Sequence, residues 1–317
     1  MGAAPPAEST DGAGPFIGAK EAIMGLKTMA VVSLPGDGRV NEDFQGSVGA
    51  AAWVLDGATG VGEDALDAPS DAYWFVRTFG RRLESALTIA PKKPYAQLIR
   101  DSTLLVKREF DEAVPGPAPD YPPSAAFILV RVISAADDGI ELELAALGDC
   151  AAYVRTVAGA IEGFDGAGST PIDTVSLDAL KRAHRDFPDA STEVVSDLLR
   201  PVLQSNRQRM NTPDGYWILS FDERAADHLV TEVKLVDPTA PIILASDGFT
   251  RAIDMLGLET PEAFYARVIN DGPDAVARDV RAIENSDTSC RRYPRLKCRD
   301  DATCVVLSVD GAGAGRS

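Results

Sequence analysis

Apolar runs of strand length follow one another along this 317-residue chain and are interrupted by pairs of helical segments. The runs expected as strands span residues 29–34, 50–55, 126–133, 140–147, 151–157, 216–221, 230–236, 241–246 and 303–309. Helices are expected at 70–90, 94–113, 176–186, 191–210, 261–270 and 273–285. Consecutive strands broken by helix pairs, without strict strand–helix alternation, favour an α+β fold with helices packed outside antiparallel sheets.

Two local signals support these assignments. Ser70 is a suitable N-cap for the first helix, and Asp71 complements the positive end of its dipole. Within that helix, apolar residues recur at helical spacing at Ala72, Val76, Phe79, Leu83 and Ala86. Asp138-Gly139, between two strand-like runs, is a typical hairpin turn.

The domain organisation is expected to be simple. Residues 1–18 and 311–317 are rich in small residues, so both are predicted to be disordered tails. Residues 19–310 then form a single domain. The polar, mixed stretch 158–213 interrupts the strand series, which indicates a flap-like insertion.

The formal net charge of −17 constrains the partners. Such a charge repels nucleic acid and anionic membranes, so neither is an expected partner. The N-terminal residues lack the basic and apolar regions of a signal peptide, and no run approaches the ~20 apolar residues of a membrane span. A cytoplasmic monomer is therefore expected. With two histidines and no Cys-x-x-Cys spacing, a zinc site is not expected.

Aspartates beside apolar runs are the most informative chemical feature. Asp56, Asp149 and Asp247 end or follow strand-like runs and have glycine on one side. Asp-Gly occurs nine times in the sequence and is an ordinary turn signal, so a single instance favours a turn over a ligand. Asp56 and Asp247 differ because the runs before them, Trp53-Val54-Leu55 and 242–245, have the character of buried strands.

A carboxylate at the end of a buried strand is unfavourable unless a positive charge compensates it. No cationic residue adjoins Asp56 or Asp247, and the nearest after Asp247 is Arg251. A divalent metal ion would compensate both carboxylates. Ligation by oxygen alone, without histidine nearby, favours Mg²⁺ or Mn²⁺ over Zn²⁺.

The order of the acidic motifs resembles that of the type-2C metal-dependent protein phosphatases. The series is NED, LDGATG, LGDC, SDGF and DDATCVV, and it spans about residues 29 to 309. The resemblance, which is to stand-alone bacterial members, implies a four-layer αββα sandwich with a dinuclear metal centre. It further implies removal of phosphate from phosphoserine or phosphothreonine of proteins, by a water that two Mg²⁺ or Mn²⁺ ions activate.

The resemblance also implies individual roles. Asp56 would bridge both ions, and the Gly57 carbonyl would bind one of them. Asp247 and Asp300 would complete the shell of the first ion. Glu42 and Asp43 would hold the second ion, and Asp149 would help to bind a third.

The sequence departs from the family pattern at several positions. Members usually have a phosphate-binding arginine five residues before the first-motif aspartate, whereas Arg39 lies four residues before Asp43. Arg39 is the candidate for that role and Arg251 is the second. Ala58 replaces a histidine found in many eukaryotic relatives, and Asp301 replaces a common asparagine, which adds charge beside Asp300.

Other interpretations remain open at this level. A basic cluster near Asp300 either helps to hold the substrate or forms a solvated loop; it consists of Arg291, Arg292, Arg295, Lys297 and Arg299. The same metal centre would serve a phosphatase of small metabolites. A non-catalytic regulatory module is disfavoured because it needs no such set of carboxylates, and a nuclease is disfavoured by the net charge.

Overall fold

The protein is built on two antiparallel β-sheets of five strands each. The structure, a computed structural model, describes residues 24–136, 139–166 and 171–310. One sheet has the order β2-β3-β4-β5-β8 and the other β1-β10-β9-β6-β7. The strands are β1 (Leu26–Leu34), β2 (Asp43–Val48), β3 (Ala51–Gly57), β4 (Ala125–Ala136), β5 (Gly139–Leu147), β6 (Ala151–Arg155), β7 (Ile161–Asp165), β8 (Val230–Val236), β9 (Ile242–Ala245) and β10 (Ala302–Val309).

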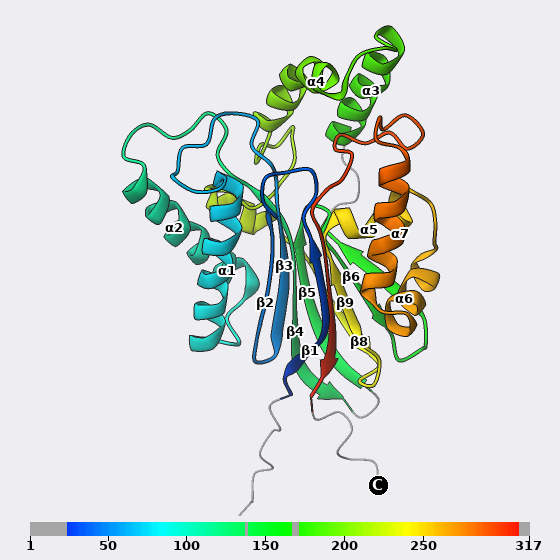
Figure 1. Ribbon diagram of the computed structural model, residues 1–317. Coiled ribbons are helices and arrows are strands. Elements are labelled where there is room, and N and C mark those ends of the chain that lie inside the picture. Colours follow the sequence, from blue (N-terminus) through cyan, green and yellow to red (C-terminus); the bar gives the residue numbers. More distant parts are fainter. Residues whose placement is uncertain (1–23, 137–138, 167–170, 311–317) are drawn as a thin grey trace, which may run out of the picture.

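Helices cover the outer face of each sheet, as Figure 1 shows. The first sheet carries α1 (Asp71–Ile89) and α2 (Tyr95–Ala113). The second carries α5 (Asp247–Asp254), α6 (Pro261–Asn270) and α7 (Pro273–Ser286). The described residues therefore form an αββα sandwich, and the expected fold class is confirmed.

The alternation of side chains along β3 explains the layering. Successive side chains on a strand point to opposite faces. Ala52 and Val54 belong to the core between the sheets, whereas Trp53 and Leu55 pack with the helix residue Phe79 in the core beneath α1 and α2. All four strand residues are almost fully buried. A central strand of this kind must be apolar throughout, which is why its run is visible in the sequence.

The start of α1 follows the predicted capping. The Ser70 hydroxyl accepts a hydrogen bond from the Tyr73 amide at 3.0 Å. The Asp71 carboxylate accepts from the amides of Ala65 and Leu66, so it also fixes the loop that precedes the helix. Helix α1 is thus positioned by local contacts at its N-terminus and by the apolar stripe along its buried face.

The helices α3 (Pro171–Asp186) and α4 (Thr192–Arg207) lie outside the four layers. Figure 1 shows them standing above one end of the sheets. They pack on each other through a small apolar cluster that includes Leu180, Val195 and Leu199. No described helix has both the length and the apolar character needed to cross a membrane.

Several local assignments need correction. The segment 216–221 is not a strand, because only Tyr216 and Leu219 form isolated bridges there. Strand β2, strand β7 and helix α5 were not anticipated: the two strands are largely polar, and the helix has only eight residues. The predicted hairpin residue Asp138 and the two predicted tails, 1–18 and 311–317, lie outside the described residues.

Candidate metal centre

The predicted acidic residues converge at one end of the sandwich. Asp43 begins β2 and is paired across the sheet with Asp56, near the end of β3. Asp247 follows β9 and Asp300 precedes β10, and these two strands are hydrogen-bonded neighbours. The carboxylates therefore come from both sheets and meet at the end where α3 and α4 stand.

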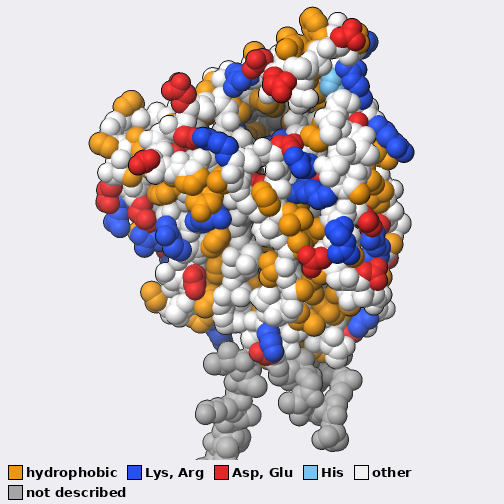
Figure 2. All heavy atoms as spheres, in the orientation of Figure 1, with side chains coloured by type: hydrophobic (Ala, Val, Ile, Leu, Met, Phe, Trp, Pro, Cys, Tyr) orange, Lys and Arg blue, Asp and Glu red, His pale blue; other side chains and the backbone are white. Residues whose placement is uncertain are grey.

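A cavity of about 440 Å³ opens among these residues. Five of the predicted metal-binding residues line it: Asp56, Gly57, Asp149, Asp247 and Asp300. Its opposite wall comes from α4 and from the loop before β10. Figure 2 shows the surface hollowed beneath α3 and α4, with acidic and basic side chains next to each other around the hollow.

The other two predicted ligands lie behind this cavity. Glu42 is buried, and its two carboxylate oxygens accept hydrogen bonds from the hydroxyls of Ser70 and Thr59. Asp43 is also buried, and its Oδ2 accepts a hydrogen bond from the Ser246 hydroxyl at 2.8 Å. The Asp43 Oδ1 is buried without any hydrogen-bond partner. A buried carboxylate oxygen left in this state marks a position for a further positive charge.

The backbone at Gly57 is closely packed as well. A Cβ atom at this position would lie 2.6 Å from the Glu42 carbonyl oxygen, which is too close for any side chain. The Gly57 amide also donates to that carbonyl at 3.1 Å. Glycine is thus required here so that the end of β3 can approach Glu42, the residue directly before β2.

The crowded carboxylates perturb one another. Burial, together with the charges of Asp43 and Asp247, raises the pKa of Asp56 well above its ordinary value. Burial and the charge of Asp300 likewise raise the pKa of Asp247. Crowded, buried carboxyl groups favour the protonated form when no cation compensates them. A divalent cation would compensate their charge and favour the ionised form.

Asp300 differs from these carboxylates because it already has cationic partners. Its Oδ1 accepts from the Lys297 ammonium at 2.7 Å, and its Oδ2 accepts from the Arg251 guanidinium at 2.8 Å. Burial alone would raise the pKa of Asp300, but Lys297 and Arg251 hold that pKa below its ordinary value. Asp300 is therefore ionised and charge-compensated within the protein itself.

Asp301, which adds charge beside Asp300, also holds the backbone of the neighbouring loop. Its two carboxylate oxygens accept hydrogen bonds from the amides of Gly36, at 2.7 Å, and Glu42, at 2.6 Å. It ties the loop before β2 to the start of β10. This contact sets the position of Glu42 and Asp43 relative to Asp300.

The structure does not bring Arg39 to the cavity. The Arg39 side chain is 83% exposed; it lies 3.5 Å from the Asp64 carboxylate and donates to the Pro69 carbonyl. Of the other basic residues near Asp300, Arg295 is fully buried against Asp287, and Arg299 pairs with Asp37. Lys297 is the member of the basic cluster that lines the cavity.

The donor set fits a hard divalent cation in chemistry. Every group is an oxygen ligand, and the unpartnered Asp43 Oδ1 lacks a positive charge that such an ion would supply. In the described part of the chain, however, no three acidic, histidine or cysteine side chains are already placed as the shell of one ion. One physical reason for the absence of such a shell is that both carboxylate oxygens of Asp300 already face protein cations, Lys297 and Arg251.

The metal-free protein should lose stability as the pH rises. Burial raises the pKa of Asp43 from 3.8 to about 7. The folded state therefore holds this proton more tightly than the unfolded chain does, so its contribution is complete below the ordinary pKa and is lost as the pH rises through about 7. Between about pH 5.5 and 7, the free energy of unfolding should fall by roughly 2 kcal/mol.

Thermal melting in chelator at a series of pH values measures this effect. Asp43→Asn should flatten the dependence, because an amide has no proton to lose. A melting temperature that rises between about pH 5.5 and 7 in the unsubstituted protein would contradict the assignment of a protonated Asp43.

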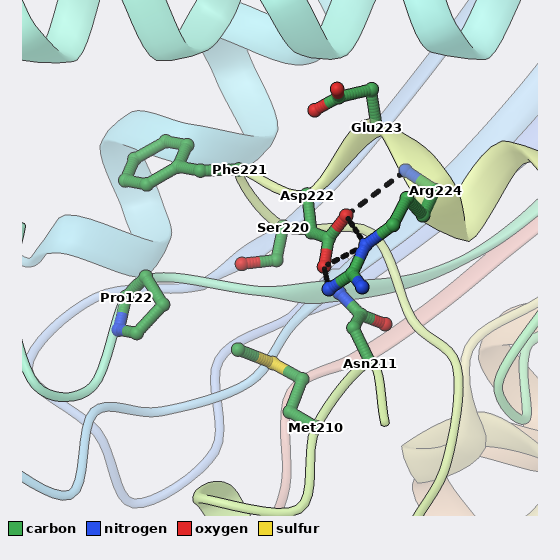
Figure 3. A pocket seen from close by; sticks show the side chains of 8 residues that line it. All are labelled: Pro122, Met210, Asn211, Ser220, Phe221, Asp222, Glu223 and Arg224. Carbon is green, nitrogen blue, oxygen red and sulfur yellow. Dashed lines mark hydrogen bonds and ion pairs between the residues drawn. The ribbon is translucent and has the colours of Figure 1, made fainter. Parts of the chain in front are cut away.

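A second cavity, of about 390 Å³, shares no lining residue with the first. Figure 3 shows that Asp222 and Arg224, which line it, are turned toward each other. Their side chains form an ion pair, and Arg224 also donates its backbone amide to Asp222. Asp222 and Arg224 therefore neutralise each other, whereas the first cavity is lined by four aspartates.

No protein-family model and no curated protein sequence matches this chain. Solved structures do match it. The serine/threonine phosphatase Stp1 from Staphylococcus aureus aligns with a TM-score of 0.50 at 14% identity, over 92% of this chain and 97% of that one. The chain has the fold of the bacterial serine/threonine phosphatases. Two variants of a bacterial serine phosphatase also align with TM-scores of 0.50, at 13% and 14% identity, over 90% of this chain and 99% of theirs.

This phosphatase fold is the one that the resemblance to type-2C enzymes implied. Three hydroxyl residues that orient its carboxylates were missed by the sequence analysis: Thr59, Ser70 and Ser246. Ser246 directly precedes Asp247, so a signal was present in the SDGF motif. Thr59 likewise lies in the LDGATG motif, but Thr59 and Ser70 reach Glu42 across loops, and no spacing in the sequence indicates that contact.

Proposed function

We propose that this chain is a metal-dependent phosphomonoester hydrolase that acts on phosphoserine and phosphothreonine in proteins. The observation that carries the proposal is the cavity where Asp56, Asp247 and Asp300 converge in front of the buried, incompletely paired Asp43. The similarity of the fold to that of a bacterial serine/threonine phosphatase also supports the proposal. A phosphorylated protein would be its substrate.

The residues that would hold the metal ions are those of the carboxylate cluster. Asp56 and Asp247 are half-buried on the cavity wall, and Asp43 adds its free Oδ1 from behind. Glu42, the Gly57 carbonyl, Asp149 and Asp300 complete the proposed set. Bound Mg²⁺ or Mn²⁺ would supply an acidified water and neutralise the charge of the phosphoryl oxygens.

The chain itself contributes position and protection from solvent. The hydroxyls of Ser70, Thr59 and Ser246 fix the carboxylates of Glu42 and Asp43, which lie too deep to exchange partners with water. The carboxylates of Asp56 and Asp247 line the cavity wall, where a bound cation would compensate their charge. Fixed carboxylates of this kind keep the site ordered before substrate arrives.

A cysteine-based mechanism has no support at this site. Cys150 follows Asp149, but it is fully buried. Burial raises the pKa of its thiol well above the ordinary value, and the charges of Asp56 and Asp149 act in the same direction. A reactive cysteine needs a lowered pKa and access to the substrate, so this one has a packing role.

The decisive experiment compares substrates in one assay. We expect the protein with Mn²⁺ or Mg²⁺ to release phosphate from a phosphothreonine peptide faster than from sugar or nucleotide phosphates, because α3 and α4 leave the cavity open at the surface. Chelation should reduce the rate to background, and added Mn²⁺ should restore it.

A peptide of otherwise identical sequence with alanine in place of the phosphothreonine, and a boiled sample, serve as controls. If a sugar or nucleotide phosphate is hydrolysed faster than every phosphopeptide, the substrate is a small metabolite and not a protein. Undiminished turnover after exhaustive chelation would contradict the metal-dependent mechanism.

A further inference from the structure

Three basic side chains line the acidic cavity in the described part of the chain: Arg200, Arg207 and Lys297. The first two come from α4, and each has a partner outside the carboxylate cluster. Arg200 pairs with Asp197 on the surface at 2.8 Å. Arg207 donates to the Ser124 hydroxyl at 2.7 Å and to the Thr59 carbonyl at 3.1 Å. Neither of them contacts a cluster carboxylate through these bonds.

Lys297 is placed differently. Its ammonium lies 2.7 Å from the Asp300 Oδ1, at the carboxylates where a phosphoryl group would have to bind. Its side chain is 38% exposed, and it belongs to the loop before β10 rather than to a helix. Lysine has a flexible four-carbon stem and three donors, so its ammonium can move between neighbouring acceptors.

The partners of Asp300 show why Lys297 is free to contact a second anion. The other oxygen, Oδ2, is held by Arg251, whose side chain is 4% exposed. Arg251 is fixed in turn by Glu284, at 2.6 Å. Asp300 therefore keeps one cationic partner when Lys297 turns away. Arg251 alone can neutralise Asp300, so the more exposed Lys297 is available to bind a second anion.

We propose that Lys297 binds the phosphoryl oxygens of the substrate. The inference rests on the proposed function, since it takes the phosphomonoester as the ligand of this cavity. Lys297 thereby provides the phosphate contact that the sequence pattern assigned to Arg39, whose side chain points to Asp64 outside the cavity. A charge-assisted hydrogen bond from the ammonium compensates part of the dianion charge and orients the ester.

The test measures phosphate affinity apart from turnover. Inorganic phosphate is titrated by calorimetry into the Mg²⁺-saturated protein and into Lys297→Met and Lys297→Arg. Lys297→Met should weaken phosphate binding roughly 10-fold or more, because one charge-assisted bond is lost. KM for a phosphopeptide should rise by a similar factor while kcat changes little. Lys297→Arg should recover most of the affinity.

Lys107→Met is the matched control. Lys107 also pairs with an aspartate, Asp111 at 2.5 Å, and its side chain is 41% exposed, but it lies on α2 away from the cavity. It should leave phosphate affinity, KM and kcat unchanged. Mg²⁺ affinity in the absence of phosphate should be unchanged or stronger in Lys297→Met, since a cation that competes for Asp300 has been removed.

The two proposals fail in different ways. Equal phosphate affinity in the unsubstituted protein and Lys297→Met, with peptide turnover intact, would overturn the role of Lys297 and leave the phosphatase function standing. Phosphate binding that depends on Lys297, in a protein that hydrolyses no phosphomonoester, would support the anion contact and overturn the enzymatic function. Weaker Mg²⁺ binding in Lys297→Met would instead assign Lys297 to the support of Asp300.

Discussion

Asp56→Asn should reduce turnover by about 10³-fold or more while the protein remains folded. Asp56 faces Asp43 across the sheet and is surrounded by Asp247 and Asp300, so its carboxylate lies at the centre of the cluster. An amide of the same shape removes one ligand charge and also removes repulsion from the metal-free fold. The melting temperature in chelator should therefore stay the same or rise.

Steady-state kinetics with Mn²⁺ and thermal melting in chelator measure the two halves of this expectation. Asp237→Asn is the matched control, because Asp237 also follows a strand but pairs with Arg155 and Thr239. Turnover within a few-fold of the unsubstituted protein in Asp56→Asn would show that the cluster is not the catalytic centre. Loss of folding in that variant would show that Asp56 is a structural residue.

Glu284→Ala should lower the free energy of unfolding by about 3–5 kcal/mol. Glu284 has no exposed side-chain surface, and its two oxygens pair with Arg251 and Arg281, each at 2.6 Å. Removing it leaves two guanidinium groups without their shared anion. The same arginines hold Asp300, Arg251 through the carboxylate and Arg281 through the backbone carbonyl, so metal affinity should also fall.

Chemical denaturation measures the first effect, and calorimetric titration with Mn²⁺ measures the second. Glu109→Ala is the comparison, since Glu109 on α2 pairs with Arg82 on α1 and has 31% of its side chain exposed. A surface pair of that kind contributes about 1 kcal/mol or less. If both variants lose the same free energy of unfolding, the buried network stabilises the fold no more than a surface ion pair does.

The acidic motifs could be located from the sequence because they adjoin buried strands. β9 and the first five residues of β3 are apolar, so Asp56 and Asp247 stand out beside these runs. Helix α1 could be predicted as well, because its N-cap and its apolar stripe are local features of the sequence. These parts of the fold are determined by residues close together in the sequence, so a single sequence is enough to predict them.

Other features depend on contacts between distant segments. β2 is largely polar and forms a strand because it pairs with β3, with Gly46 beneath the Trp53 ring. Arg39 lies beside Asp64 on the surface, and Asp301 accepts hydrogen bonds from the amides of Gly36 and Glu42. No spacing within one segment could have indicated these partners.

The two sheets contribute separate halves of the cluster, and this has a consequence for how the protein responds to change. Asp43 and Asp56 belong to one sheet, whereas Asp247 and Asp300 flank strands of the other. An ion held by both halves would be a cross-link between the layers. Any sliding of one sheet over the other would then change the ion's coordination distances. Ile128 and Leu244 belong to the core between the two sheets. We therefore expect substitutions at these positions to alter the affinity for such an ion, although neither residue lines the cavity.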